Sequence, residues 1–292
     1  VDYTDGTGSL LVEPQRTNLV LTSASGSYGS APASEILAIA PDGENTAIRP
    51  VPSSGSNRYQ ETISGGTYSS ADEVTYSWYR KRFSTPVIDV YIGDLRINAL
   101  VNCTQVGVTT EIASSISGYD RFSATFSITD GALSSILRFY FGAAIGTGNS
   151  SIAYWGHQLE QGSYATSYIP TDGSTVTRVK DQYEKTGISD KINSEEGTFF
   201  LEMAALSDDL TYRSITISDN TNTNNNRVLI QLSNTTNKII GLIGSGGSTQ
   251  AVFITTSYNT LESNKIAITW KLNEFKMFIN GDKIGEDNLG ST

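Results

Sequence analysis

The chain has 292 residues, a formal net charge of −10 at pH 7, and only one Cys and one His. One Cys cannot form an internal disulfide, and one Cys with one His cannot build the usual Cys/His zinc site. An acidic chain without a basic stripe disfavours nucleic acid and anionic lipid as partners. No stretch reaches the roughly 20 apolar residues of a membrane-spanning helix, so we expect no membrane insertion.

The composition favours strands over helices. Charged residues make up 17% of the chain, and β-branched and aromatic residues are plentiful. This composition is typical of strands joined by polar turns. The length suits two hydrophobic cores better than one, because a domain usually spans about 100 to 200 residues. We therefore predict an all-β chain with two antiparallel β-sandwich domains in tandem.

In the first half, the segment 34–40 is the best helical candidate, and Pro41 ends it early. Strand signals then recur between clusters of Gly, Ser, Asn and Asp. They lie at 74–83, 87–92, 95–101, 121–128, 135–142 and 151–159. This spacing predicts an antiparallel sandwich.

From Pro170 to Glu196 the alternation gives way to turn formers and charges. We place the domain boundary there, with a first domain at 1–172, a linker at 173–196 and a second domain at 197–292. Within the second domain, Asn280-Gly281 is the strongest hairpin signal in the chain. The strand signals of this domain lie at 198–206, 213–218, 227–233, 238–243, 250–255, 264–272 and 274–279.

Two stretches of the first domain resemble a known family. GSLLVEPQRTNLV at 8–20 and YWGHQLEQGSYATSYIPTDGSTVTRV at 154–179 resemble the opening and closing signatures of a carbohydrate-binding-module-like jelly-roll domain common in phage tail and other virion proteins. His157 departs from the closing signature, where small residues are more familiar. The first domain is therefore expected to be a jelly roll.

The second domain resembles the concanavalin-like, or laminin-G-like, lectin sandwich. The stretch NKIAITWKLNEFKMFINGDKIG carries this resemblance. Strands of that family continue further, so the resemblance implies a domain incomplete at Thr292 and a chain that is a fragment of a longer polypeptide.

Together the two resemblances imply a non-catalytic virion component, such as part of a tail fibre, spike or capsid decoration. Such a protein would lie on the virion surface, contact other virion proteins, and bind a polysaccharide or host-surface glycan. Adhesion through many weak sites would suit a homo-oligomer such as a trimer.

Sugar binding needs flat aromatic rings beside planar hydrogen-bonding groups. Along 74–83, alternation places Tyr76 and Trp78 on one face and Tyr79 on the other, so the pattern leaves open which face is core. Cationic groups on an acidic chain favour an acidic polysaccharide. The residues that we expect on a solvent-exposed, glycan-binding face are Arg80, Arg138, Tyr140, Tyr154 and Gln158.

The first resemblance also implies a structural calcium ion, as jelly-roll modules of this type often carry one. Glu13, Asp42 and Glu160 lie in suitable segments and supply hard oxygen ligands. No EF-hand spacing supports such an ion, so we favour roles in ion pairs or turns for these residues and predict no metal site. We expect no other cofactor.

The sequence contains no GxSxG nucleophile elbow, Walker loop or HExxH motif, so we expect no catalysis. His157 lies within a signature strand with no marked nucleophile beside it, which favours a structural role. Two alternatives to adhesion stay open. One is a purely structural spacer or assembly module without sugar binding. The other is a polysaccharide-degrading enzyme or its accessory module, and such an enzyme needs two carboxylates about 5 to 10 Å apart. Candidates for such a pair are Glu73, Asp89, Glu111 and Glu202.

Overall fold

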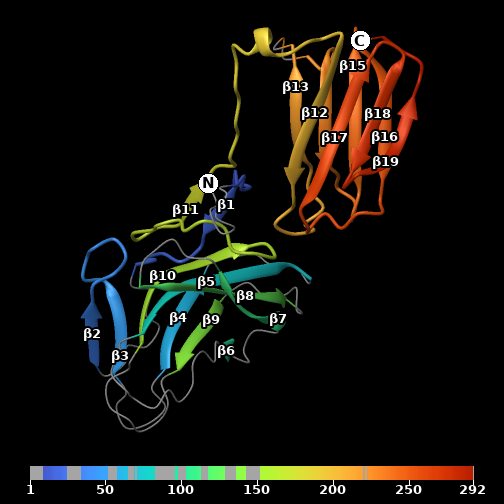
Figure 1. Ribbon diagram of the computed structural model, residues 1–292. Coiled ribbons are helices and arrows are strands. Elements are labelled where there is room, and N and C mark those ends of the chain that lie inside the picture. Colours follow the sequence, from blue (N-terminus) through green and yellow to red (C-terminus); the bar gives the residue numbers. More distant parts are fainter. Residues whose placement is uncertain are drawn as a thin grey trace. The chain divides into compact units, whose positions relative to one another are not determined.

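The computed structural model describes residues 9–24, 34–51, 58–64, 69, 71–82, 96–97, 103–112, 118–128, 136–142, 152–219, 221 and 223–291. The chain divides into two compact units, Val1–Gln182 and Tyr183–Thr292. This division falls inside the segment 173–196 that we predicted as a linker. Both units are built from antiparallel sheets, which confirms the all-β fold class (Figure 1).

Helix is nearly absent from the part of the chain that the structure describes. It consists there of the three-residue 3-10 helix η1, Ser189–Lys191. No helix among these residues has the length and apolar character needed to cross a membrane.

The first unit contains three sheets (Figure 1). The largest has the strand order β2-β3-β10-β5-β8-β7, formed by Ser34–Ala38, Ala47–Val51, Ile152–Gln161, Glu73–Arg82, Asp120–Ile128 and Cys103–Ile112. A three-stranded sheet has the order β4-β9-β6, formed by Arg58–Ser64, Ile136–Gly142 and Arg96–Ile97. The strands β1, Arg16–Asn18, and β11, Val176–Arg178, form a two-stranded sheet.

The helix predicted at 34–40 is wrong, because Ser34–Ala38 is strand β2. It pairs with β3 along its whole length, from Ser34 opposite Val51 to Ala38 opposite Ala47. Backbone pairing with a neighbouring strand overrides the weak local preference for helix. The predicted strand at 87–92 lies outside the described residues.

Both faces of the central strands β5 and β10 are buried. Tyr76, Trp78 and Tyr154 belong to one hydrophobic cluster, whereas Tyr79 and Trp155 belong to another. Because successive side chains of a strand point to opposite faces, these clusters lie on the two sides of the same sheet. The sheet centre therefore offers no solvent-exposed face for a ligand.

A β-bulge in β10 changes which side chains share a face. The pairing of β10 with β5 shifts between Trp155 and Gln158. Gly156 lies inside this bulge with a φ of +64°, and a Cβ there would come within 2.6 Å of the Tyr79 ring. Such a bulge reverses the alternation that follows it. Tyr154 and Gln158, which simple alternation would put on one face, consequently lie on opposite faces.

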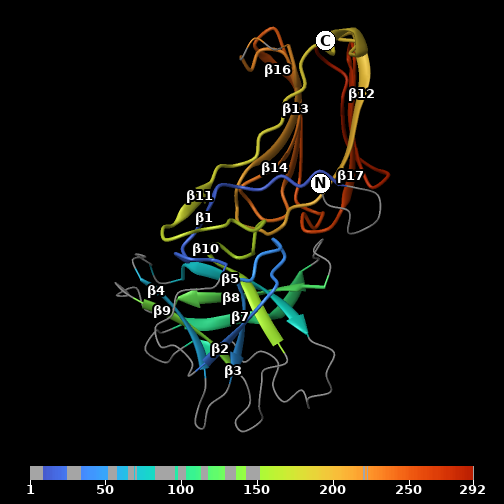
Figure 2. The same ribbon diagram turned by 90° about the vertical axis from the view of Figure 1, so that its left-hand side faces the viewer.

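The second unit is a two-layer sandwich, and Figure 2 shows its two sheets edge-on. One sheet has the order β12-β17-β18-β19, formed by Glu196–Met203, Asn264–Lys271, Glu274–Ile279 and Asp282–Asp287. The other has the order β13-β14-β15-β16, formed by Arg213–Ser218, Arg227–Leu232, Ile239–Ser245 and Ser248–Thr255. The core between them includes the fully buried side chains of Ile230, Ile239, Ile266, Ile268, Phe275 and Met277.

The hairpin predicted at Asn280-Gly281 is confirmed. It joins β18 to β19, with Ile279 opposite Asp282. Asn280 and Gly281 have φ values of +53° and +96°, the left-handed conformation that the tightest hairpin turns require at both central residues. This turn fixes the end of the sheet at which the candidate site lies.

Candidate functional site

Two of the predicted glycan-binding residues, Arg80 and Tyr154, lie opposite each other on β5 and β10. They are 7% and 5% exposed, and the Arg80 guanidinium carbon lies 4.0 Å from the centre of the Phe122 ring. Burial raises the pKa of the Tyr154 hydroxyl to about 12. The expectation that these two side chains lie on a solvent-exposed face is wrong, since both faces of the sheet centre are covered.

Gln158 is fully buried, so its expected exposure is also wrong. Its Nε2 donates to Glu160 Oε2 at 2.7 Å, and its Oε1 accepts from the backbone N–H of Ile169 at 2.6 Å. A buried amide engaged in this way holds the loop after β10 against the sheet. It has a structural role instead of facing solvent.

Arg138 and Tyr140, the other two predicted residues, belong to β9. The backbone of this strand pairs with β4, with Arg138 opposite Thr62 and Tyr140 opposite Gln60. Their side chains lie outside the described residues.

The opening and closing signatures meet in a buried polar network. The Asn18 side chain donates to the carbonyl groups of His157 and Ile169, and accepts from the N–H groups of Val20 and Leu159. Three of these four bonds join the end of β1 to strand β10 and the loop that follows it. Asn18 is fully buried. Residues that carry the family resemblance therefore hold the fold together.

The three carboxylates considered for calcium do not converge on one point. Glu13 pairs with Arg178 at 2.8 Å, and Asp42 accepts from the Glu44 N–H at 3.0 Å. Glu160 is buried and accepts hydrogen bonds from Gln158 and from both the N–H and the hydroxyl of Thr166. Ion-pair and turn roles thus account for these residues. Over the described ranges, no group of three His, Cys, Asp or Glu residues is placed to hold a metal ion.

His157 lies beside this network. It is fully buried, and its Nδ1 lies 2.8 Å from the Tyr76 hydroxyl. Burial lowers the pKa of its imidazole to about 3, so the ring is neutral at physiological pH. This buried environment agrees with the structural role expected for it.

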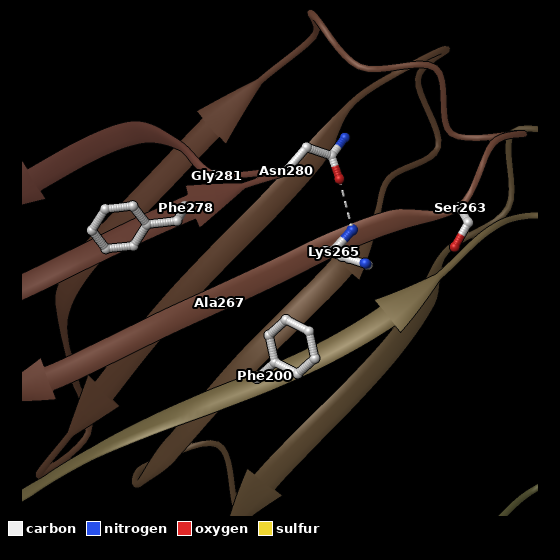
Figure 3. Close-up of a pocket in the computed structure, with 7 residues that line it drawn as sticks. All are labelled: Phe200, Ser263, Lys265, Ala267, Phe278, Asn280 and Gly281. Atoms are coloured by element: carbon white, nitrogen blue, oxygen red, sulfur yellow. Dashed lines mark hydrogen bonds between the residues drawn. The ribbon is translucent and has the colours of Figure 1, made fainter.

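An open site lies on the second unit, on the outer face of the β12-β17-β18-β19 sheet. A hollow of about 630 Å³ is lined there by Phe200, Ser263, Lys265, Ala267, Phe278, Asn280 and Gly281 (Figure 3). Sequence reasoning did not identify any of these residues as a site.

The pairing of three strands creates the hollow. Phe200 on β12 lies opposite Ala267 on β17, which lies opposite Phe278 on β18. Figure 3 shows the two rings on either side of Ala267. The Cα atoms of the two Phe residues are two strand spacings apart, roughly 9.5 Å. Because Ala267 is small, a space remains between the rings.

A polar rim closes one end of the hollow. Asn280 Oδ1 accepts from the Lys265 N–H at 2.9 Å, and Asn280 Nδ2 donates to Asn264 Oδ1 at 3.0 Å. Ser263 Oγ donates to Glu202 Oε1 at 2.6 Å. The arrangement places two apolar rings beside polar and charged groups on an open sheet face. That combination can hold a ligand with both an apolar surface and hydrogen-bonding groups.

The carboxylates considered for catalysis are distributed over both units. Glu202 lies next to the hollow on β12, whereas Glu73 and Glu111 belong to strands β5 and β7 of the first unit. Asp89 lies outside the described residues.

No protein-family model matches the chain, and a search of curated proteins gives no match.

Proposed function

We propose that the second unit binds carbohydrate without chemical conversion, through the hollow on its outer sheet. The observation that carries this proposal is the row Phe200, Ala267, Phe278, in which two aromatic rings flank a small residue. Phe200 is 59% exposed, and it lies on a sheet whose other face packs against a well-filled core. A ligand that covers this ring would remove the apolar surface from water.

A sugar ring has the chemical features that the hollow suits. Its C–H faces can pack on aromatic rings, and its hydroxyl groups can bond to a polar rim. The hollow has a size typical of small-molecule sites, which span about 300 to 1,000 Å³. Its open face would let the ligand extend further as a polysaccharide chain.

The lining of the hollow favours binding over hydrolysis. Glycosidases use two carboxylates at close separation. The seven lining residues include no carboxylate, and the nearby Glu202 accepts a hydrogen bond from Ser263. The charged group that lines the hollow is Lys265.

We further propose that this binding serves adhesion by a virion-surface protein, as the resemblance of the two signatures and the lectin-like hairpin implies. A shallow single site binds weakly, and several copies held on one particle raise the overall affinity. The partner is then a polysaccharide or a host-surface glycan.

The test is a glycan-array screen of the multimerised full chain beside a Phe200→Ala/Phe278→Ala variant. A Tyr212→Ala variant is the matched control, because Tyr212 is also 59% exposed but does not line the hollow. We expect the wild type and the control to bind the same glycans and the double variant to lose them. Absence of binding to every glycan, or full binding by the double variant, overturns the proposal.

A second candidate function is assembly through the outer face of the other sheet, with a second copy of the chain as partner. Two cross-strand rows on this face are uncharged throughout, and strands β15 and β16 contribute apolar side chains to both. They are Thr216, Leu229, Leu242, Val252 and Ser214, Gln231, Ile240, Ile254. Val252 and Ile254 are 51% and 55% exposed. Copies that each carry a charge of −10 repel each other least where an uncharged face meets its equivalent.

This candidate is tested by light scattering during size-exclusion chromatography over a range of protein concentrations. We expect a Val252→Lys/Ile254→Lys variant to dissociate, while the control variant Leu272→Lys, at a position that is 61% exposed elsewhere, stays associated. A wild-type chain that is monomeric at every concentration eliminates this function.

A further inference from the structure

We infer that the hollow selects an acidic glycan, with the Lys265 ammonium group binding an anionic substituent of the sugar. This inference rests on the proposed function of the hollow and adds the chemical class of the ligand. It follows from the charges on the outer face of the β12-β17-β18-β19 sheet.

The four Lys residues of this sheet differ in one respect. Three of them have a carboxylate partner: Lys271 Nζ lies 3.5 Å from Glu196, Lys276 Nζ 2.5 Å from Glu274, and Lys283 Nζ 2.8 Å from Glu286. Lys265 is exposed and, among the residues that the structure describes, has no carboxylate within 4 Å of its Nζ. The lysine that lines the hollow is therefore the lysine of this sheet whose charge is not neutralised.

The closest candidate partner of Lys265 is engaged elsewhere. Glu202 lies directly opposite Lys265 in the pairing of β12 with β17. One of its oxygens accepts the hydrogen bond of Ser263. This bond fixes Glu202 toward the loop before β17, and the ammonium group of Lys265 stays available to a ligand.

The rim fixes the strand that carries Lys265. Asn280 accepts from the Lys265 backbone N–H and is in turn held by Asn264, so β17 is anchored to the hairpin turn at this point. The Lys265 side chain has no such anchor and can adjust to a ligand. The backbone of β17 is thus fixed in advance, while the ammonium group of Lys265 can move. This combination suits a sugar ring that packs on the Phe side chains and carries a charged substituent at its edge.

The geometry matches the dimensions of an acidic sugar. Lys265 and Ala267 lie two residues apart on β17 and point to the same face, with their Cα atoms roughly 7 Å apart. A sugar ring placed over Ala267 between the two Phe rings would direct an anionic substituent toward Lys265, whose four-carbon side chain can span the remaining gap.

The experiment measures binding of the full chain to pairs of polysaccharides in which one member carries an anionic substituent and the other is neutral. Suitable pairs are polygalacturonate and its methyl ester, hyaluronate and its carboxyl-reduced form, and dextran sulfate and dextran. The variants are Lys265→Ala, Lys265→Arg and Phe200→Ala. Lys191→Ala removes the same charge at an exposed position that does not line the hollow, and serves as the control.

We expect the wild type to bind an acidic member more tightly than its neutral counterpart, and Lys265→Ala to lower that affinity about tenfold. Lys265→Arg and Lys191→Ala should retain the preference, whereas Phe200→Ala should weaken both members of a pair. Whether the carboxylated or the sulfated pairs respond identifies the anion. Equal binding of acidic and neutral members, or an unchanged preference in Lys265→Ala, overturns this inference but leaves the proposed function standing. Failure of every polysaccharide to bind overturns both.

Discussion

The buried polar network of the first unit and the hollow of the second unit both contain side chains of types that suit sugar binding, but these side chains differ in exposure. In the network, an amide such as Gln158 and a carboxylate such as Glu160 are buried and fully engaged with the backbone and with each other. In the hollow, Phe200 and Lys265 face solvent. Residue types that suit sugar binding therefore mark a site only where the fold leaves them exposed.

The largest expected effect comes from removing a ring that we first expected in a glycan site. Tyr154→Ala should lower the free energy of unfolding of the first unit by about 3 to 5 kcal/mol, because it empties a large volume in a hydrophobic cluster. Urea denaturation followed by tryptophan fluorescence in a Trp270→Phe background reports on this unit through Trp78 and Trp155. A loss below about 1 kcal/mol would show that Tyr154 is not part of the core.

Removing the Asn18 amide should be the next most damaging change. Asn18→Ala deletes four hydrogen bonds to buried backbone groups and should cost about 2 to 4 kcal/mol. Hydrogen exchange should show faster exchange at the Val20 and Leu159 amides. The neighbouring Thr17→Ala, which removes an exposed hydroxyl pair with Thr177, is the control and should have little effect. Unchanged protection at both amides would contradict the role assigned to the network.

His157 makes the stability of the first unit depend on pH. Its pKa is lowered to about 3 in the folded unit and is near 6.5 when unfolded, so the unfolded state binds more protons between these values. Stability should therefore fall as the pH drops below 6.5, by at most about 1.4 kcal/mol per pH unit. Urea denaturation at several pH values between 7 and 5 measures this slope. Most carboxylates titrate below this range and therefore contribute little to it.

Two controls accompany the pH experiment. His157→Gln removes the only imidazole of the chain and should abolish the slope. The second unit contains no His and should unfold at the same urea concentration at pH 7 and pH 5. A slope that persists in His157→Gln would assign the effect to another group.

The smallest effect on stability should come from Phe200→Ala in the hollow. The side chain is 59% exposed, so its removal should change the free energy of unfolding of the second unit by less than about 0.5 kcal/mol. The same variant should lose glycan binding. Unfolding of the second unit, followed by the fluorescence of Trp270, and glycan binding are measured on one preparation. A large loss of stability would show that Phe200 belongs to the core and not to the site.

The second unit was the easier part to predict from the sequence. Its strands alternate regularly, as in β17, where Ile266, Ile268 and Trp270 point inward. Asn280 and Gly281 supplied the left-handed turn that joins β18 to β19. Regular alternation and a specific turn both act locally, so the sequence carries them directly.

The first unit was harder because its decisive features are not local. The bulge at Gly156 reverses the faces of Tyr154 and Gln158, and an isolated glycine in a strand does not specify such a reversal. Strand β7 was missed because it is largely exposed, with Val108 79% exposed, and lacks apolar alternation. Burial on both sides of β5 comes from segments remote in sequence.

The hollow could not be located from the sequence alone, since it depends on the pairing of three strands. The sequence does indicate that Phe200 points away from the core, because Phe199 and Leu201 on either side of it are packed against the core. What brings Phe200, Ala267 and Phe278 into one row is the register of β12 with β17 and of β17 with β18. That register becomes clear only once the strands are assembled.

The pairing of β1 with β11 has a mechanical consequence. Arg16 lies opposite Arg178, and beyond this pair the backbones of Glu13 and Asp181 are joined by a hydrogen bond. The segments that open and close the first unit therefore lie side by side. Tension applied between Glu13 and Asp181 would break the backbone hydrogen bonds between β1 and β11 one after another, and not all at once.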